Sequence, residues 1–163
     1  MKIGRVKRLL TSCFGLGYLP IAPGTWGSMA PVAIFILALF LRVTADAITA
    51  IITAIIILAS IVCVKFSSEA IKVTGKNDPS EVVADEVAGQ AIAFLGIYPT
   101  ETKMIFITAL VGFLAFRLFD ILKPWPICKL EKLPGGWGIW ADDILAGLYA
   151  WAVLQIFSRI FMI

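Results

Sequence analysis

The stretch AITAIITAIIILASIVCV, residues 47–64, decides the class of fold because it runs for eighteen residues without a charge. An α-helix needs roughly twenty apolar residues to cross the hydrocarbon core of a bilayer. Of all 163 residues, 60% are hydrophobic and 15% are charged, and the mean hydropathy is +0.95. A typical soluble domain is about 45–50% apolar and about 25% charged. The sequence therefore predicts an all-α integral membrane protein.

Other apolar runs flank this stretch and predict a bundle of about four to five apolar helices in a single domain, residues 1–163. These runs are residues 29–41, 82–98, 104–116 and 144–157. Each is shorter than a full span, so length alone also allows buried core helices. A soluble helical bundle is the alternative fold.

The distribution of basic residues favours the membrane fold. Five crossings from a cytoplasmic N-terminus place three of the fourteen basic residues outside, namely Arg42, Lys103 and Arg159. The other eleven lie on the cytoplasmic side, as the positive-inside rule expects. They are Lys2, Arg5, Lys7, Arg8, Lys65, Lys72, Lys76, Arg117, Lys123, Lys129 and Lys132.

The same topology brings three polar segments, residues 15–28, 77–90 and 117–147, together on the cytoplasmic side. The first segment is rich in glycine and proline and leads into an apolar run, so Gly24, Thr25 and Ser28 are expected at a helix N-terminus. Free amides and the positive end of the helix dipole favour phosphate there. A plain turn is the alternative, because the loop matches no established phosphate-binding pattern.

The second segment carries Asp85 and Glu86 within an apolar run, and Asp78 or Ser80 is a candidate helix cap. An ionised carboxylate inside an apolar span costs about 2.5–3.5 kcal/mol even on lenient insertion scales. Acids in such positions are candidates for function, and we interpret these two in that way.

The third segment combines cations with acids. Arg117, Asp120 and Lys123 follow one another at three-residue steps, and Asp142 and Asp143 follow a glycine cluster at the head of the last apolar helix. One of the paired aspartates is a candidate N-cap, and a structural Arg117–Asp120 pair is an alternative for the cations. Carboxylates from several helix ends suit Mg²⁺, and Arg and Lys suit a phosphate. The pattern predicts a phosphorylated lipid as substrate.

Residue counts exclude several other phosphatase chemistries. The chain has no histidine, which removes mechanisms that need a phosphohistidine or a histidine acid. No arginine stands six residues after Cys13 or Cys128, as a cysteine phosphatase requires. Attack by water or by a carboxylate with metal assistance remains. A small transporter or channel with an acidic cluster in the membrane is the alternative function.

The segments GLGYLPIAPGTWGS, NDPSEVVADEVAGQ and FRLFDILKPWPICKLEKLPGGWGIWADDILAG resemble, in this order, those of the phosphatidylglycerophosphatase A family. The resemblance implies a Mg²⁺-dependent, multi-pass enzyme of the bacterial inner membrane whose active site faces the cytoplasm. Such an enzyme hydrolyses phosphatidylglycerophosphate to phosphatidylglycerol and phosphate in phospholipid biosynthesis. The implied partners are this phospholipid and the membrane, with no nucleic acid, and the oligomeric state stays open.

The resemblance also implies roles for particular residues. The catalytic acids are Asp85, Glu86, Asp120, Asp142 and Asp143. The phosphate-binding groups are Gly24, Thr25, Ser28, Arg117 and Lys123. As a hypothesis, Asp85, Asp142 and Asp143 hold Mg²⁺, and Glu86 or Asp120 positions the attacking water. Arg117 stabilises the charge on the transferring phosphoryl group.

Overall fold

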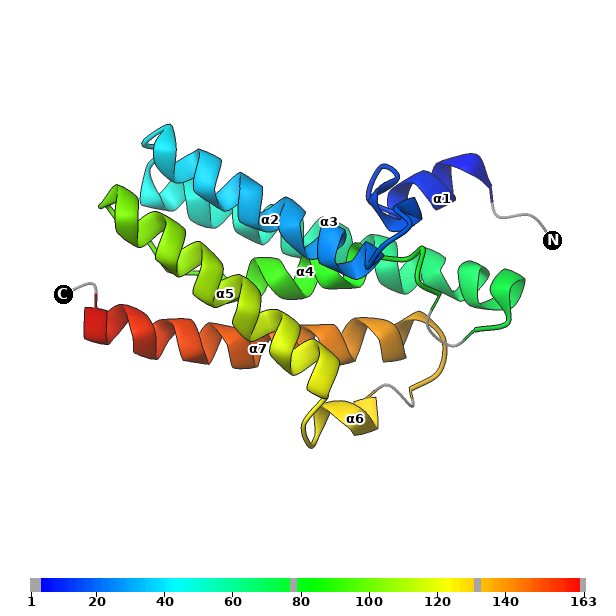
Figure 1. The fold of residues 1–163 in the computed structure, drawn as a ribbon. Coiled ribbons are helices and arrows are strands. Elements are labelled where there is room, and N and C mark those ends of the chain that lie inside the picture. The colour runs from blue at the N-terminus through cyan, green and yellow to red at the C-terminus, as the bar shows by residue number, and fades with distance from the viewer. Residues whose placement is uncertain (1–3, 77–78, 131–132, 162–163) are drawn as a thin grey trace.

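The computed structural model describes residues 4–76, 79–130 and 133–161, and the regular structure within these ranges is helical. One short 3-10 helix, η1, lies between the first two α-helices. Figure 1 shows the order of the elements along the chain. The elements are α1 (Arg5–Thr11), η1 (Leu16–Tyr18), α2 (Pro23–Phe40), α3 (Ala45–Thr74), α4 (Ala84–Ala93), α5 (Thr102–Leu122), α6 (Ile127–Leu130) and α7 (Gly136–Phe161).

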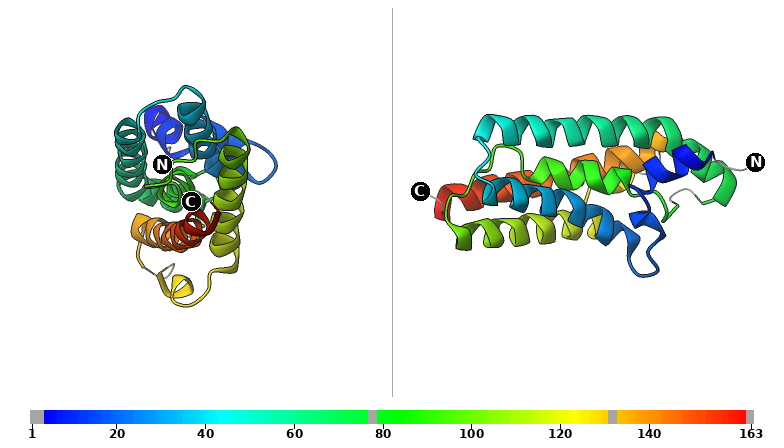
Figure 2. Two further views of the ribbon diagram at one scale, coloured as in Figure 1. Left: turned by 90° about the vertical axis from the view of Figure 1, so that its left-hand side faces the viewer. Right: turned by 90° about the horizontal axis from the view of Figure 1, so that it is seen from above.

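Four of these helices, α2, α3, α5 and α7, are long and apolar enough to cross a membrane. They lie side by side as a bundle (Figures 1 and 2). Their outward faces carry large apolar side chains, such as Leu58 on α3 at 64% exposure and Leu110 on α5 at 57%. Exposed apolar surface on this scale indicates contact with lipid. The predicted all-α bundle of apolar helices is confirmed.

Local sequence explains where the long helices begin and end. Pro23 occupies the first position of α2, where its fixed φ suits a helix and no amide hydrogen is needed. Thr44 caps α3, because its hydroxyl oxygen accepts a hydrogen bond from the Ala47 amide at 3.4 Å. Gly75, with φ of 71°, ends the same helix in the left-handed conformation that glycine adopts readily.

The fifth predicted apolar run, residues 82–98, differs from the other four. Its helix, α4, has only ten residues and rises about 15 Å, which is half the thickness of a bilayer core. Every residue of α4 except Glu86 is buried, and the helix packs against α2, α3, α5 and α7 (Figure 2). The run is apolar because protein, not lipid, surrounds it.

The chain nevertheless passes from one end of the bundle to the other through α4. Beyond the helix, the Tyr98 hydroxyl hydrogen-bonds with Thr49 near the start of α3, at the end of the bundle opposite the start of α7 (Figure 1). Arg42, Lys103 and Arg159 therefore share one end of the bundle, as predicted. Of the eleven basic residues expected at the other end, Lys2 and Lys132 lie outside the described residues.

A close approach of backbones holds α4 against α7. A Cβ atom added to Gly147 would lie 2.3 Å from the carbonyl oxygen of Gly89, so neither position has room for a larger residue. Deeper in the core, the rings of Phe35 on α2 and Phe94 stack at a centroid distance of 4.3 Å. These contacts fix α4 rigidly inside the bundle.

Two predicted helix starts are wrong. Helix α4 begins at Ala84, and its N-cap Val83 makes no side-chain cap, so Ser80 does not start the helix. The alternative cap, Asp78, lies outside the described residues. Helix α7 begins at Gly136, which places Asp142 and Asp143 inside the helix and not at its cap. Tertiary packing explains this early start, because Gly136 fits against the backbone of α3 at Cys63 and Val64.

Candidate active site

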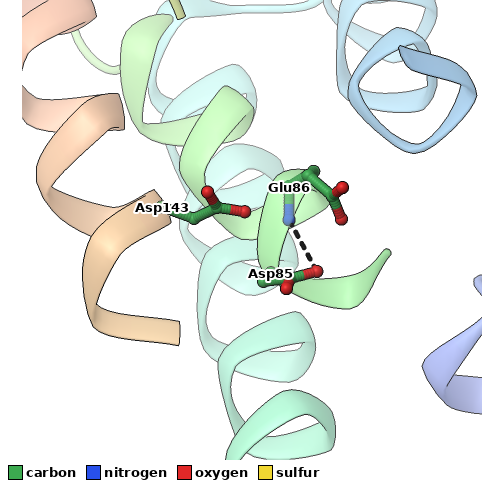
Figure 3. A group of neighbouring side chains, drawn as sticks. All are labelled: Asp85, Glu86 and Asp143. Atoms are coloured by element: carbon green, nitrogen blue, oxygen red, sulfur yellow. Dashed lines mark hydrogen bonds between the residues drawn. The ribbon is translucent and has the colours of Figure 1, made fainter. Parts of the chain in front are cut away.

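Three carboxylates from two helices meet at the end of the bundle that carries the predicted site. Asp85 and Glu86 lie in the first turn of α4, and Asp143 lies on α7 (Figure 3). One carboxylate oxygen from each lies within 4.8 Å of the other two. Asp85 is 3% exposed and Asp143 is 4% exposed. We call these three residues the acidic trio.

The start of α4 positions the first two acids. The Val83 amide donates a hydrogen bond to the Thr11 carbonyl at 2.9 Å, which ties the entry of α4 to the end of α1. The Glu86 amide then donates to Oδ1 of Asp85 at 3.0 Å (Figure 3). Carboxylates at this position also face the positive end of the helix dipole. Local backbone geometry thus stabilises negative charge at the N-terminal end of α4.

The trio is suited to a divalent cation. Buried carboxylates this close repel one another, and burial away from water strengthens the repulsion. Hard divalent ions such as Mg²⁺ prefer carboxylate oxygens and take only a few of them from the protein. A cation held by Asp85, Glu86 and Asp143 would turn an unfavourable cluster into a favourable one.

Two basic side chains, Arg117 and Lys123, lie at the same end as the trio, and each pairs with an acid outside it. Arg117, on α5, donates a hydrogen bond to Oδ2 of Asp120 at 2.6 Å. Lys123, directly after α5, donates to Oδ2 of Asp142 at 2.6 Å. Lys123 has a positive φ of 42°, and its amide donates to the Phe119 carbonyl. The end of α5 thus directs two cations to the site.

The N-terminal turn of α2 closes the site on another side. A Cβ atom added to Gly24 would lie 2.2 Å from Oε1 of Glu86 and 3.3 Å from a guanidinium nitrogen of Arg117. Ser28 is buried, and its hydroxyl donates to the Gly24 carbonyl at 2.8 Å. The Thr25 amide donates to the Ala22 carbonyl at 2.9 Å, within the turn itself. The backbone of Gly24 therefore stands directly beside a carboxylate and a guanidinium.

All ten predicted site residues lie at this end of the bundle, but they divide into groups. The structure brings Asp85 and Asp143 together with Glu86, whereas the carboxylate of Asp142 meets Lys123. Asp120 pairs with Arg117 and is also an electrostatic neighbour of Asp143. The predicted metal set of Asp85, Asp142 and Asp143 thus differs from the trio by one residue.

Sequence reasoning overlooked Gln90. This side chain is fully buried on α4, and its Nε2 donates to the Gly112 carbonyl of α5 at 3.4 Å. Its position four residues after Glu86 places it on the same face, one turn deeper in the bundle. The available signal was an amide side chain in residues 87–98, which are otherwise apolar.

Cys63 is a second neighbour of the trio that sequence reasoning did not include in the site. The structure places it on α3, fully buried and close enough to Asp85 to interact electrostatically. The Ser67 hydroxyl donates to its sulfur at 3.4 Å. The spacing of the cysteines gave no sign of this neighbour.

Comparisons with known proteins agree with this arrangement. A family model described as Phosphatidylglycerophosphatase A matches residues 9–158. Phosphatidylglycerophosphatase A of Haemophilus influenzae is 38% identical over 152 residues, which cover 92% of this chain and 86% of that protein. Phosphatidylglycerophosphatase A of Escherichia coli K12 is 30% identical over 160 residues, which cover 98% and 87%.

A third relative has a different name. A Bacteroides thetaiotaomicron protein, provisionally named a phosphatidylinositol-3-phosphatase, is 32% identical over 148 residues, or 91% of each chain. No solved structure gives a significant match to this chain. The family model covers far more than half of the sequence, and its segment contains every residue of the site. The chain therefore belongs to the phosphatidylglycerophosphatase A family, a family of phosphatases.

Proposed function

We propose that this protein is a Mg²⁺-dependent lipid phosphatase that hydrolyses phosphatidylglycerophosphate to phosphatidylglycerol and phosphate, as a step of phosphatidylglycerol biosynthesis. The observation that carries the proposal is the meeting of the acidic trio with Arg117 and the backbone of Gly24. This arrangement combines groups for a cation with groups for a phosphate. Membership of the family supports the same reaction.

The trio supplies the oxygen ligands that Mg²⁺ prefers, so Asp85, Glu86 and Asp143 are the residues that would hold it. When bound, Mg²⁺ offsets the negative charge of a phosphate and of the attacking water as it loses a proton. Asp142 is placed differently, because its carboxylate accepts a hydrogen bond from Lys123. Its proposed part is to hold that ammonium group at the site.

Arg117 is the proposed phosphate clamp. Its planar guanidinium donates several hydrogen bonds in a fork that matches phosphate oxygens. Asp120 orients this group through the 2.6 Å hydrogen bond. As the ester bond breaks, charge spreads over the phosphoryl oxygens, and a fixed guanidinium stabilises that charge without having to reorient.

Hydrolysis also requires proton movement. The oxygen of water bonds to phosphorus, the bond from phosphorus to the lipid oxygen breaks, and the leaving oxygen takes up a proton. In this proposal, a carboxylate oxygen of Glu86 or Asp120 accepts a proton from the attacking water, and the resulting carboxyl group gives that proton to the leaving oxygen. Both side chains are partly exposed, so solvent and substrate reach them more readily than Asp85 or Asp143. Direct attack by a carboxylate is the alternative route.

Apolar surface beside the site supports a substrate that remains in the membrane. Ile21, just before α2, is 78% exposed, and Ile121 and Leu122 at the end of α5 are 69% and 67% exposed. Lipid acyl chains are the natural partners for such side chains. A lipid whose headgroup phosphate lies at the trio and whose acyl chains lie in the bilayer would contact both the polar site and this apolar surface.

The basic residues at this end support a cytoplasmic orientation in a bacterial inner membrane. Arg5, Lys7, Arg8 and Lys72 lie at the same end as the trio, and the positive-inside rule assigns such an end to the cytoplasm. Lys7 also pairs with Glu69, which attaches α1 to the end of α3.

The decisive test is phosphate release from phosphatidylglycerophosphate in detergent micelles, with Mg²⁺ and with excess chelator. We expect release by the wild type only with Mg²⁺ and none by Asp143→Asn. Asp46→Asn is the matched control, because Asp46 is an exposed acid at the opposite end of α3. The control should retain wild-type release.

The name of the Bacteroides relative calls for a second substrate. Phosphatidylinositol 3-phosphate is therefore assayed in parallel under the same conditions. Faster release from that lipid would overturn the choice of headgroup while keeping a metal-dependent lipid phosphatase. No release from either lipid by folded wild type would reject the enzyme and leave a transporter or channel.

A further inference from the structure

A hollow lies at the end of the bundle opposite the acidic trio. It has a volume of about 520 Å³ and is formed by the end of α2, the start of α3, the segment after α4 and the start of α5. Arg42, Tyr98, Thr100 and Thr102 contribute polar groups to its wall. The proposed reaction does not use this hollow, because every residue proposed to take part in the reaction lies at the other end of the bundle.

The wall of the hollow favours an anion. Arg42 is exposed and forms no ion pair within the described ranges. The first residues of α3 and α5, Ala45 and Thr102, also line it, so the positive ends of two helix dipoles lie at its edge. The neighbouring acids Asp46 and Glu101 are not part of the lining.

The surroundings of the hollow are apolar and point to a lipid. Ile48 and Ile105 line it and are 2% and 4% exposed. Outside it, Leu37, Leu41 and Phe106 are 58%, 67% and 53% exposed on the surface that faces the bilayer. A cation and hydroxyl groups beside lipid-facing side chains fit a molecule with a phosphate headgroup and acyl chains.

We propose that this hollow binds the headgroup of an anionic phospholipid from the leaflet opposite the active site. The Arg42 guanidinium donates to the phosphate oxygens, and the Thr100 and Thr102 hydroxyls donate from the other side. The acyl chains run down the outer surface past Leu37 and Phe106. The site is separate from the phosphatase site and does not depend on the proposed reaction.

The test measures lipid retained by the purified full-length protein in native mass spectrometry. The protein in detergent is titrated with dioleoyl phosphatidylglycerol or with dioleoyl phosphatidylcholine. Arg42 has a positive φ of 52°, a conformation that asparagine also adopts. Arg42→Asn therefore removes the guanidinium without straining the backbone.

We expect Arg42→Asn to retain one phosphatidylglycerol fewer than the wild type, with affinity at that site about tenfold lower, as loss of a charge-assisted hydrogen bond predicts. Arg159→Asn is the matched control, since Arg159 is also exposed and lies at the same end but outside the hollow. It should retain phosphatidylglycerol like the wild type. Arg42→Lys should fall between, because it keeps the charge and loses the fork.

Three results would overturn the proposal. Equal retention by Arg42→Asn and wild type would show that Arg42 holds no lipid, and equal loss in Arg159→Asn would show a diffuse charge effect. Displacement of the lipid by millimolar inorganic phosphate would show that the hollow takes a free anion instead. Phosphate release by all three variants should match the wild type, which keeps this test separate from that of the phosphatase.

Discussion

Gly147 lies directly against Gly89, so close that a Cβ at position 147 would approach the Gly89 carbonyl oxygen to 2.3 Å. Each glycine stands four residues, or about one helical turn, after a member of the acidic trio: Gly89 after Asp85, and Gly147 after Asp143. The glycine contact and the carboxylate cluster therefore lie on the same facing sides of α4 and α7. A change in the distance between α4 and α7 at the two glycines would therefore also change the distance between the carboxylates of the two helices.

Gly147→Ala should lower both stability and phosphate release. The new methyl group meets backbone atoms, so the helices must separate, at a cost of about 1–3 kcal/mol. Thermal unfolding in detergent and the release assay measure the two effects. Gly4→Ala is the control, because nothing lies within 4 Å of a Cβ there. Unchanged unfolding in Gly147→Ala would contradict the close contact.

Gly24→Ala should behave differently from Gly147→Ala. Its methyl group meets the end of the flexible Glu86 side chain, which moves aside at little cost to the fold. The carboxylate then leaves its place, and a displacement of about 1 Å in a catalytic group lowers the rate on the order of 100-fold. We expect near wild-type unfolding with greatly reduced release. A variant with normal activity would remove Gly24 and Glu86 from the proposed mechanism.

Asp85→Asn should stabilise the protein when metal is absent. The substitution removes one of three clustered charges and keeps the oxygen that accepts the Glu86 amide. In excess chelator its unfolding temperature should exceed that of the wild type. Added Mg²⁺ should reverse the order, since saturation at about 100 times Kd stabilises a binding protein by roughly 2.7 kcal/mol. The control variant Asp46→Asn, which changes an exposed acid, should have the same unfolding temperature as the wild type in both conditions. If Mg²⁺ raised the unfolding temperatures of Asp85→Asn and of the wild type equally, Asp85 would not be a ligand.

Arg117→Lys should lower kcat more than it raises KM. A lysine keeps the charge, but it cannot match the phosphate with a planar fork or keep the same bond to Asp120. Loss of a fixed donor to developing charge typically lowers kcat by about 100-fold or more. Arg5→Lys, an exposed basic residue at the same end, is the control. Unchanged kcat with raised KM would show that Arg117 binds the substrate and the transition state equally well and gives no extra stabilisation to the transition state.

The sequence allowed the helical bundle to be predicted from the length of its apolar runs. It also allowed the candidate site residues to be placed at one end of the bundle, because the polar segments alternate with those runs. It could not distinguish the buried run around α4 from a lipid-facing span, since both are largely apolar and periodicity alone does not separate a buried helix from one in lipid. The early start of α7 could not be predicted from the sequence either. Glycines 135, 136 and 138 oppose a helix by propensity, and only packing against α3 overrides them.

The different partners of Asp142 and Asp143 could not be predicted from the sequence either. Neighbouring residues on a helix point about 100° apart, so Asp142 and Asp143 need not face the same partner. Spacing alone does not tell which one turns toward α4 and which toward Lys123. That choice depends on how α7 is rotated in the bundle, and long-range packing sets the rotation.

The enclosure of α4 has a consequence for how the protein is made. During synthesis, this ten-residue helix with two acids emerges before α5 and α7 exist, and it is too short and too charged to remain in lipid alone. The helix can be stably buried only after α5 and α7 have been inserted and cover it. The carboxylates of α4 meet Asp143 at that step, so the acidic trio is completed only at the end of membrane insertion. A chain truncated before α7 would carry Asp85 and Glu86 without the third carboxylate.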